Sequence, residues 1–482
     1  MAKGPGILKR LSAARKAFAS GVGYEITVSS RTRRALSIIS GLSAGADRHQ
    51  DSYTLGRLRE ICRMHDRQSA LFSGLLDRAV SNIFGASFDF IPATGDRDMN
   101  EVAKRYITRR MEARFADAAG ERDLPEIAAA SLRAVWNDGD ILHVMRKDGS
   151  LATFEADQVV TPSGYSSEAG PRIVMGVELD DNNRHLGYRV KVRKTSNDTG
   201  MVRRDGGSER IPKRFALFSA YRKRFGQTRG VPFLAAALGI FDRTSNYLDY
   251  EQLAAEGNAM LGFKIKKEPS GVDLDGVEDN EYASSDTFEK IQKMEPFEVF
   301  DLAPGEDVDM IGSQRPGSNF EPYIITCCRI IGVAVGFPLE LMLLDFSRTN
   351  YSSARASLGE GRRMFRMWQR FSGRTLCEPW YRWQIARGIA TGELPADGRL
   401  FGVRCQWPAW EYIDPYKEAM GNKVALENRT KSISECIRER GGEPSEVFAE
   451  IAEDKKTLET LGVAPASGAE PVEENKETEE EK

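Results

Sequence analysis

The chain has 482 residues, of which 41% are hydrophobic and 29% are charged, and its formal net charge is −3. This length exceeds what one hydrophobic core usually organises, so we expect several domains or one segmented subunit. The longest apolar run, IITCCRIIGVAVGF (324–337), is too short to cross a bilayer and is interrupted by Arg329. The sequence therefore predicts no membrane span, and its basic N-terminus lacks the apolar core of a secretory signal.

Charge is concentrated at the two ends of the chain. Residues 1–34 contain eight bases against Glu25, and residues 464–482 contain seven glutamates against two lysines. A basic arm and an acidic tail suit contacts with charged partners, although solvated, disordered termini explain the same pattern. The six cysteines include no C-x-x-C pair, which excludes the usual zinc-ribbon and thioredoxin spacings and suits a reducing cytosol.

The first half of the chain predicts an α+β body. Apolar residues at helical spacing predict helices in three places, and alternating runs around turn-forming residues predict two hairpins. The helices are expected within 54–82, 98–118 and 124–137, and the hairpins within 140–160 (turn at Asp148-Gly149) and 172–192 (turn at 180–183).

The second half begins with a helix, a β-rich excursion and a second helix. The roughly thirty residues after Pro232 have helical periodicity and predict a long helix. The composition of residues 262–318 predicts strands and turns. The next helix should run from about Phe320 to Val335, because Gly336 and Pro338 follow it. Two or three short helices are expected in 411–461, before an acidic low-complexity tail.

A third long helix is predicted at about 352–390, with a basic face and an apolar face. At 100° per residue five arginines share one arc and five large apolar residues share the other side. The arginines are Arg355, Arg362, Arg366, Arg370 and Arg374, and the apolar residues are Met364, Phe365, Met367, Trp368 and Phe371. The basic stripe is compatible with a DNA-facing surface and equally with an ion-pair face within or between subunits.

Enzymatic motifs are weak in this sequence. GLSAG (41–45) matches a nucleophile elbow around Ser43, but too little chain precedes it to build the required sheet. The four histidines are far apart and no Walker A sequence occurs, which argues against a histidine metal site and against ATP hydrolysis. The acidic clusters at 178–181 and 307–309 lie in segments whose composition is typical of turns, where solvated acids are common. We expect no catalytic residue, no cofactor and no metal. The alternative is a nucleic-acid-processing or hydrolytic enzyme that uses Ser43.

Several motifs resemble those of the lambda-type bacteriophage portal protein family. DFSRTNYSSARASL (345–358) resembles the family signature, and FGQTRGVPFLA (225–235) resembles its G-Q-x-R-G-V-P motif. GVELDDNNRHLGYRV (176–190), LAPGEDV (302–308) and DPYKEA (414–419) follow in family order around them. The resemblance covers about residues 53–450. One departure is ALFSAY (216–221), where relatives often carry a histidine after the leucine.

The resemblance implies a portal fold with an α/β wing, a two-helix stem, a β-containing clip and a helical crown, assembled into a ring. Its segments divide the chain along its length. They are a basic N-terminal arm (1–52), the wing (53–231), stem helix 1 (232–261), the clip (262–318), stem helix 2 (319–338), a tunnel loop (339–352), a wing return with the long helix (353–410), the crown (411–463) and an acidic tail (464–482).

The same resemblance implies a ring, typically of twelve copies, at one vertex of the phage head, through which DNA enters during packaging and leaves during ejection. Double-stranded DNA would pass without sequence-specific contacts. The implied protein partners are the terminase large subunit, a head–tail adaptor, and the major capsid and scaffold proteins, with assembly in the bacterial cytoplasm. The DNA-tunnel candidates are Arg348, Asn350, Ser352, Ser353 and Arg355. Residues such as Asn350 and the two serines could equally serve only to cap the helix that follows.

Overall fold

A computed structural model describes residues 52–462 except 163–164, 166–170, 192–193, 196–201, 204–207, 260–262, 268–305, 311–318, 348 and 411–413. The chain divides into two compact units. Unit 1 comprises Met1–Gly239 and Ile331–Lys482, and unit 2 comprises Ile240–Ile330.

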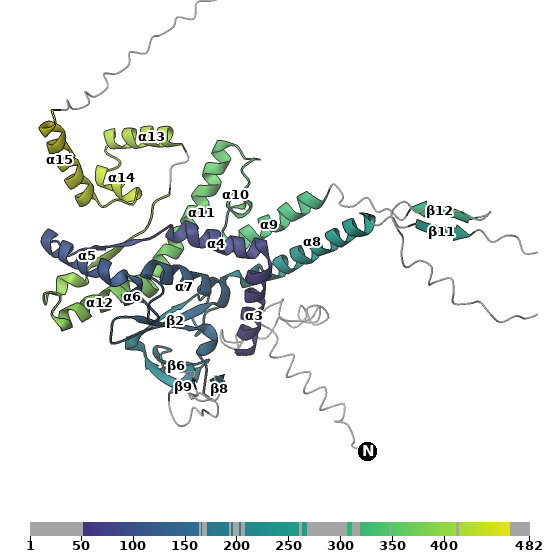
Figure 1. Cartoon of the computed structure of the whole chain (residues 1–482), viewed down its shortest axis with the longest axis horizontal. Coiled ribbons are helices and arrows are strands. Elements are labelled where there is room, and N and C mark those ends of the chain that lie inside the picture. The colour runs from purple at the N-terminus through teal and green to yellow at the C-terminus, as the bar shows by residue number, and fades with distance from the viewer. Residues whose placement is uncertain are drawn as a thin grey trace, which may run out of the picture. The chain divides into compact units, whose positions relative to one another are not determined.

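The helices expected in the first part of unit 1 are all present (Figure 1). They are α3 (Ser52–Gln68), α4 (Ala70–Phe84), α5 (Arg97–Met111), the short α6 (Ala113–Ala116) and α7 (Leu124–Asp138). Local sequence sets their starts. Ser69 caps α4, and Asp123 and Glu126 form a reciprocal capping box at α7, so the free backbone N–H groups of the first turn find acceptors.

Two antiparallel sheets follow these helices. The first has the order β10 (Ala216–Ala220), β2 (Asp140–Met145), β3 (Leu151–Glu155), and Gly149 provides the positive φ of the predicted β2–β3 turn. The second has the order β4 (Arg172–Val174), β5 (Val177–Leu179), β6 (His185–Lys191), β9 (Ser208–Pro212). A further strand pair is β7 (Lys194–Thr195) with β8 (Val202–Arg203).

The prediction of two strands in 172–192 was incomplete. Met175 and Gly176 both have positive φ, 47° and 84°, and they split the first run into β4 and β5. A side chain at residue 176 would lie 2.6 Å from the backbone nitrogen of Val160, so this tight turn requires glycine. The turn is hard to see in the sequence because methionine rarely adopts a positive φ.

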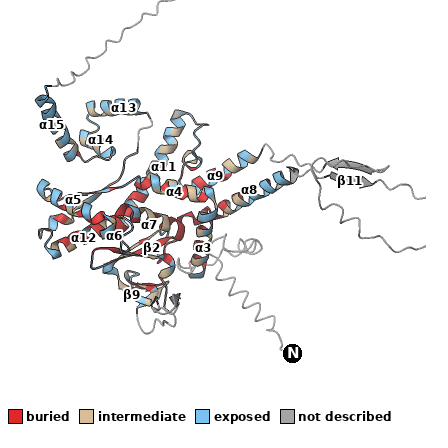
Figure 2. Cartoon of the chain, in the orientation of Figure 1, coloured by how far each residue is buried: buried red, intermediate tan, exposed pale blue. Residues whose placement is uncertain are grey.

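The core of unit 1 contains an aromatic cluster and an aliphatic cluster. Trp136 of α7 lies 4.7 Å from Phe233 and 5.4 Å from Trp368, measured between ring centroids. The aliphatic cluster joins the two sheets and consists of Leu142, Val159, Val177, Leu179, Tyr188 and Val190. Figure 2 shows α7 and β2 largely buried, whereas α15 (Pro444–Thr460) is mostly exposed, with only Pro444 at its start buried.

The long helix predicted at 352–390 is confirmed, with one irregularity. It consists of α11 (Tyr351–Ser372), a π-helical segment η9 (Gly373–Cys377) and α12 (Glu378–Thr391). Pro379 at the start of α12 has no N–H to donate, and the N–H of Glu378 reaches back to the carbonyl of Gly373. The proline accounts for the wider turn without breaking the helix.

Unit 2 contains helical and strand segments at the places expected from the sequence. After the short η6 (Phe233–Ala236) comes α8 (Leu238–Ala259), and later α9 (Phe320–Val335) ends at Gly336, as predicted. Within unit 2 the ring of Tyr247 on α8 lies 4.5 Å from that of Tyr323 on α9. Between the helices, β11 (Phe263–Lys267) pairs with β12 (Glu306–Met310), while most of 262–318 lies outside the described residues.

The remaining elements of unit 1 complete the fold. Strand β1 (Asp89–Pro92) pairs with β13 (Val403–Gln406), and three short turns of 3-10 helix are η3 (Ala156–Gln158), η5 (Lys213–Phe215) and η10 (Gly398–Phe401). The C-terminal helices are α13 (Pro415–Glu427), α14 (Ile433–Glu439) and α15, in agreement with the expected number. None of the helices in the described ranges has the length and hydropathy to cross a membrane.

Candidate nucleic-acid interface

The loop that carries the DNA-tunnel candidates is ordered by its own hydrogen bonds. It follows the short helix α10 (Leu339–Leu343) and includes Leu344, whose φ of 53° turns the chain. The carboxylate of Asp345 accepts from the backbone N–H of Ser347 at 3.0 Å and from its hydroxyl at 2.6 Å. The loop is thus built from local contacts. Arg348 lies outside the described residues.

Asn350 is the N-cap of α11. Its side-chain oxygen accepts from the backbone N–H of Ser353 at 2.8 Å, which is the capping role that the sequence analysis left open. Ser352, Ser353 and Arg355 are exposed and lie within the first five residues of the same helix. Four of the five candidates therefore share one helix end, where an exposed arginine and two hydroxyls accompany backbone N–H groups that favour anions.

The start of α11 is held against α10. The hydroxyl of Ser357 donates to the carboxylate of Glu340 at 2.8 Å, and the rings of Phe337 and Phe365 lie 5.7 Å apart. A Cβ atom at Gly361 would lie 2.7 Å from the ring of Pro338, so the two segments approach as closely as a glycine permits. The loop therefore emerges from a fixed base.

The arginine stripe serves at least partly inside the subunit. The guanidinium groups of Arg362 and Arg366 lie 5.8 Å and 5.5 Å from the ring of Trp410, which donates to the carbonyl of Asn82 at 2.9 Å. Arg355, Arg370 and Arg374 are exposed. On the other face Phe365 and Trp368 are buried as expected, but Met367 is 50% exposed.

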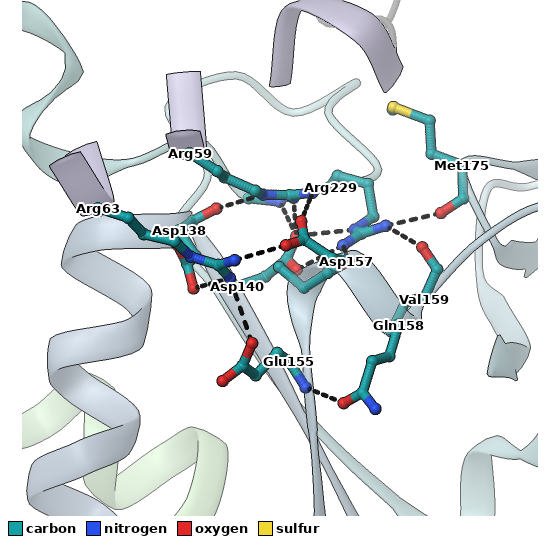
Figure 3. Close-up of polar contacts among 12 residues, drawn as sticks. Arg59, Arg63, Asp138, Asp140, Glu155, Asp157, Gln158, Val159, Met175 and Arg229 are labelled. Atoms are coloured by element: carbon teal, nitrogen blue, oxygen red, sulfur yellow. Dashed lines mark hydrogen bonds and ion pairs between the residues drawn. The ribbon is translucent and has the colours of Figure 1, made fainter. Parts of the chain in front are cut away.

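A buried polar cluster of unit 1 surrounds Arg229 of the G-Q-T-R-G-V-P segment (Figure 3). Arg229 donates twice to the carboxylate of Asp140, at 2.7 and 2.8 Å, and donates to three backbone carbonyls. Both side chains are almost fully buried, at 3% and 0% exposure. Burial disfavours an ionised Asp140, but the charges of Arg229 and Arg59 and a bond from Gly230 outweigh it, so the pKa of Asp140 lies below its usual range.

Two arginines of α3 extend this cluster. Arg59 donates to the carbonyl of Asp138 at 2.9 Å and lies 3.7 Å from Asp140, and burial lowers the pKa of Arg59. Arg63 forms a bidentate pair with Asp138 at 2.8 Å and also contacts Asp157 at 2.6 Å (Figure 3). We call these residues, Arg59, Arg63, Asp138, Asp140, Asp157 and Arg229, the arginine–aspartate network.

The network fixes the chain where it leaves β10 of the first sheet for η6 and the start of α8. A Cβ atom at Gly230 would lie 1.9 Å from the carbonyl oxygen of Gly139, so the two glycines allow the backbones to touch beside Asp140. Two residues further on, Pro232 leads into Phe233, whose ring packs on Trp136 and Trp368. The sequence motif around Arg229 did not predict its carboxylate partner, for which Asp138-Gly139-Asp140 was a weak local signal.

His143, one of the four histidines, has a structural role. His143 is buried in β2, and its ring contacts the hydroxyls of Ser131 at 2.8 Å and Thr153 at 2.9 Å. Because the Ser131 hydroxyl donates to the carbonyl of Ile127 at 2.5 Å, it accepts from Nε2 of His143 and is not activated as a nucleophile. Ser43 lies outside the described residues.

Glu178 and Asp180 of the first acidic cluster have partners within the subunit. Glu178 is buried between Arg189, at 2.7 Å, and Arg210, at 2.6 Å, while Asp180 accepts from backbone N–H groups of its own turn. Asp307 and Asp309 are register partners of Lys266 and Lys264 in the β11–β12 pair. Across the described part of the chain, no group of three or more His, Cys, Asp or Glu side chains has the arrangement of a metal site.

Comparison with known proteins gives matches over most of the chain. The profile of the family described as "Phage portal protein, lambda family" matches residues 33–369. The chain is 24% identical over 378 residues to the "Probable portal protein" of Halomonas phage phiHAP-1, covering 76% of this chain and 72% of that protein. It is 25% identical over 183 residues to "Portal protein B" of Escherichia phage lambda, which is 35% of this chain and 34% of the lambda protein.

Solved structures give weaker matches. A chain of the neck of a native GTA particle, computed with C12 symmetry, aligns with 86% of this chain and 99% of its own length, at 15% identity and a TM-score of 0.44. A chain of the neck of an empty GTA particle aligns with 80% of this chain and 94% of its own length, at 13% identity and a TM-score of 0.46. These TM-scores are low, so the family assignment rests on the sequence matches.

Proposed function

Because the chain belongs to the lambda family of phage portal proteins, we propose that it forms, with copies of itself, a closed ring at one vertex of a phage head through which double-stranded DNA is packaged and ejected. The observation that carries this proposal is the family match over residues 33–369, which includes both long helices of the stem-like segment and the opening turns of α11. A ring of twelve copies is the assembly that we expect.

The segments expected from the sequence supply the parts of such a ring. We assign the body of helices and sheets in 53–231, with the return through 353–410, to the wing. Residues 232–261 and 319–338 are the stem, 262–318 the clip and 411–463 the crown. Exposed Leu248, Tyr250 and Leu253 on α8 support contacts between copies, because large apolar side chains favour burial against a neighbour.

We assign the loop at 339–352 to the narrow part of the channel. Arg348, Asn350, Ser352, Ser353 and Arg355 would give weak, sequence-independent contacts to passing phosphates. Few charges per copy suit this role, because a ring multiplies each contact and tight binding would slow a moving duplex. The support is the exposure of Ser352, Ser353 and Arg355 and the fixed base of the loop on α10.

We propose a structural role and no catalysis, so the energy for packaging comes from a separate motor. The clip is the docking surface that we assign to the terminase large subunit and, after packaging, to a head–tail adaptor. The wing and crown would contact the capsid and scaffold proteins while heads assemble in the host cytoplasm.

A packaging reaction tests the proposal. Heads assembled from the phage's own capsid and scaffold proteins, with terminase, ATP and linear DNA, would be compared with and without this chain. We expect DNase-resistant DNA only when the chain is present from the start of assembly. Equal protection without the chain would contradict the portal role. ATP hydrolysis by the chain alone would contradict the structural role.

A further inference from the structure

A basic loop on unit 1 has no assigned role in the ring. Residues 222–226, RKRFG, follow β10 and place three consecutive bases before an aromatic residue. All five residues are exposed, and Phe225 is fully exposed. We call residues 222–226 the basic loop. The loop therefore presents an exposed aromatic ring next to three positive charges.

The base of the loop is fixed. The side-chain oxygen of the buried Gln227 accepts from the backbone N–H groups of Lys223 and Arg224, the latter at 2.6 Å. The backbone N–H of Val231 donates to the carbonyl of Tyr221 at 3.1 Å and closes the loop. Arg229 of the arginine–aspartate network lies two residues beyond Gln227, so the loop is anchored beside a buried, ion-paired cluster.

The surroundings of the loop are positive. The ion pairs within 172–231 and from it include those of Glu178 and Asp140, and none among the described residues includes Lys223, Arg224 or the neighbouring exposed Lys213. The charges of Arg222 and Lys213 add to burial in lowering the pKa of His185 to about 4. A concentrated positive surface on a chain of net charge −3 indicates an anionic partner.

The shape of the loop selects among anionic partners. Phe225 is fully exposed and directly follows three bases in the sequence, whereas peptides and small ligands are usually held in a hollow. A double helix supplies the hollow itself, because its grooves are lined by phosphates and admit apolar side chains while Lys and Arg contact the two rims. We propose that the basic loop is a double-stranded DNA contact, with Lys223 and Arg224 on phosphates and Phe225 in the adjoining groove. The surface is complete in one copy, so the proposal does not depend on the ring or the channel.

Binding of a fluorescent DNA duplex of about two helical turns to the full chain, measured by anisotropy over a salt series, tests the proposal. The variants are Lys223→Gln with Arg224→Gln, and Phe225→Ala. The matched control is Lys455→Gln with Lys456→Gln, two adjacent exposed bases on α15. Melting temperatures confirm that each variant is folded.

Each phosphate contact contributes about 0.9 to the slope of log affinity against log salt, so the double loop variant should lower that slope by roughly 1.8. Its affinity should fall by at least about tenfold at low salt. Phe225→Ala should weaken binding severalfold with an unchanged slope, because it removes no charge. The α15 control should bind as the wild type does.

Three results would overturn the proposal. One is wild-type affinity and slope in the double loop variant. Another is an equal loss in the α15 control. The third is a double loop variant that binds DNA as the wild type does but has a lower oligomeric mass, because the loop would then contact another copy. The same holds if that variant binds DNA normally but no longer binds a peptide of residues 464–482, because the loop would then contact an acidic segment.

Discussion

Removing the guanidinium group of Arg229 should destabilise unit 1 more than any exposed substitution. In Arg229→Met the carboxylate of Asp140, with 0% exposure, loses two hydrogen bonds, and three backbone carbonyls lose their donor. Arg59 remains 3.7 Å away and replaces only part of the charge compensation. Breaking a buried ion pair from one side costs about 3–5 kcal/mol, so we expect a loss of that order in the free energy of unfolding.

Chemical denaturation followed by circular dichroism measures this loss. The control is Arg57→Met, which removes an exposed pair with Glu60 and should change stability by less than about 1 kcal/mol. Asp140→Asn alone should also be destabilising, and the double variant should cost less than the sum of the two, by roughly 1–3 kcal/mol. A single Arg229→Met change as small as that of the control, or strict additivity in the double variant, would refute the assignment of the network as the main polar anchor.

Further expectations concern the loop, pH and the enzymatic alternative. Asn350→Ala should lower the free energy of unfolding by about 1 kcal/mol through loss of the cap. Arg348→Ala should instead reduce the amount of packaged DNA without lowering the melting temperature. Normal packaging by rings of both variants would refute the channel role. The pKa of His143 is lowered from 6.5 to about 4 by burial, so the unfolded chain gains its proton first as pH falls. The free energy of unfolding should then drop by up to about 3 kcal/mol between these pH values, and His143→Gln should flatten the curve, while an unchanged curve would exclude this origin. Ser43→Ala should assemble and package normally, and a specific loss of packaging would support the hydrolase alternative. Deletion of 262–318 should abolish terminase binding, and retained binding would refute the clip assignment.

Segments whose signals are local could be predicted closely. The helix at Phe320–Val335 was predicted to its end because Gly336 and Pro338 follow it in sequence. The long helix through α11 and α12 was predicted from periodicity alone, although its π-helical segment at Gly373–Cys377 was not. Secondary structure of this kind depends on residues a few positions apart.

The polar anchors could not be predicted, because they join distant parts of the chain. Arg229 and Asp140 are 89 residues apart, and Arg63 and Asp138 are 75 apart, so no window of sequence contains both partners. The cap at Asn350 was foreseen only as one of two roles, since an asparagine before a helix fits both a cap and an exposed contact. Tertiary pairing decides such cases.

The mass of the purified full chain, measured by multi-angle light scattering at working concentration, tests the central claim most directly. A portal ring predicts one closed species of about twelve times the 53.7 kDa of a single chain, unchanged on moderate dilution. A stable monomer of 53.7 kDa under the same conditions would contradict the account.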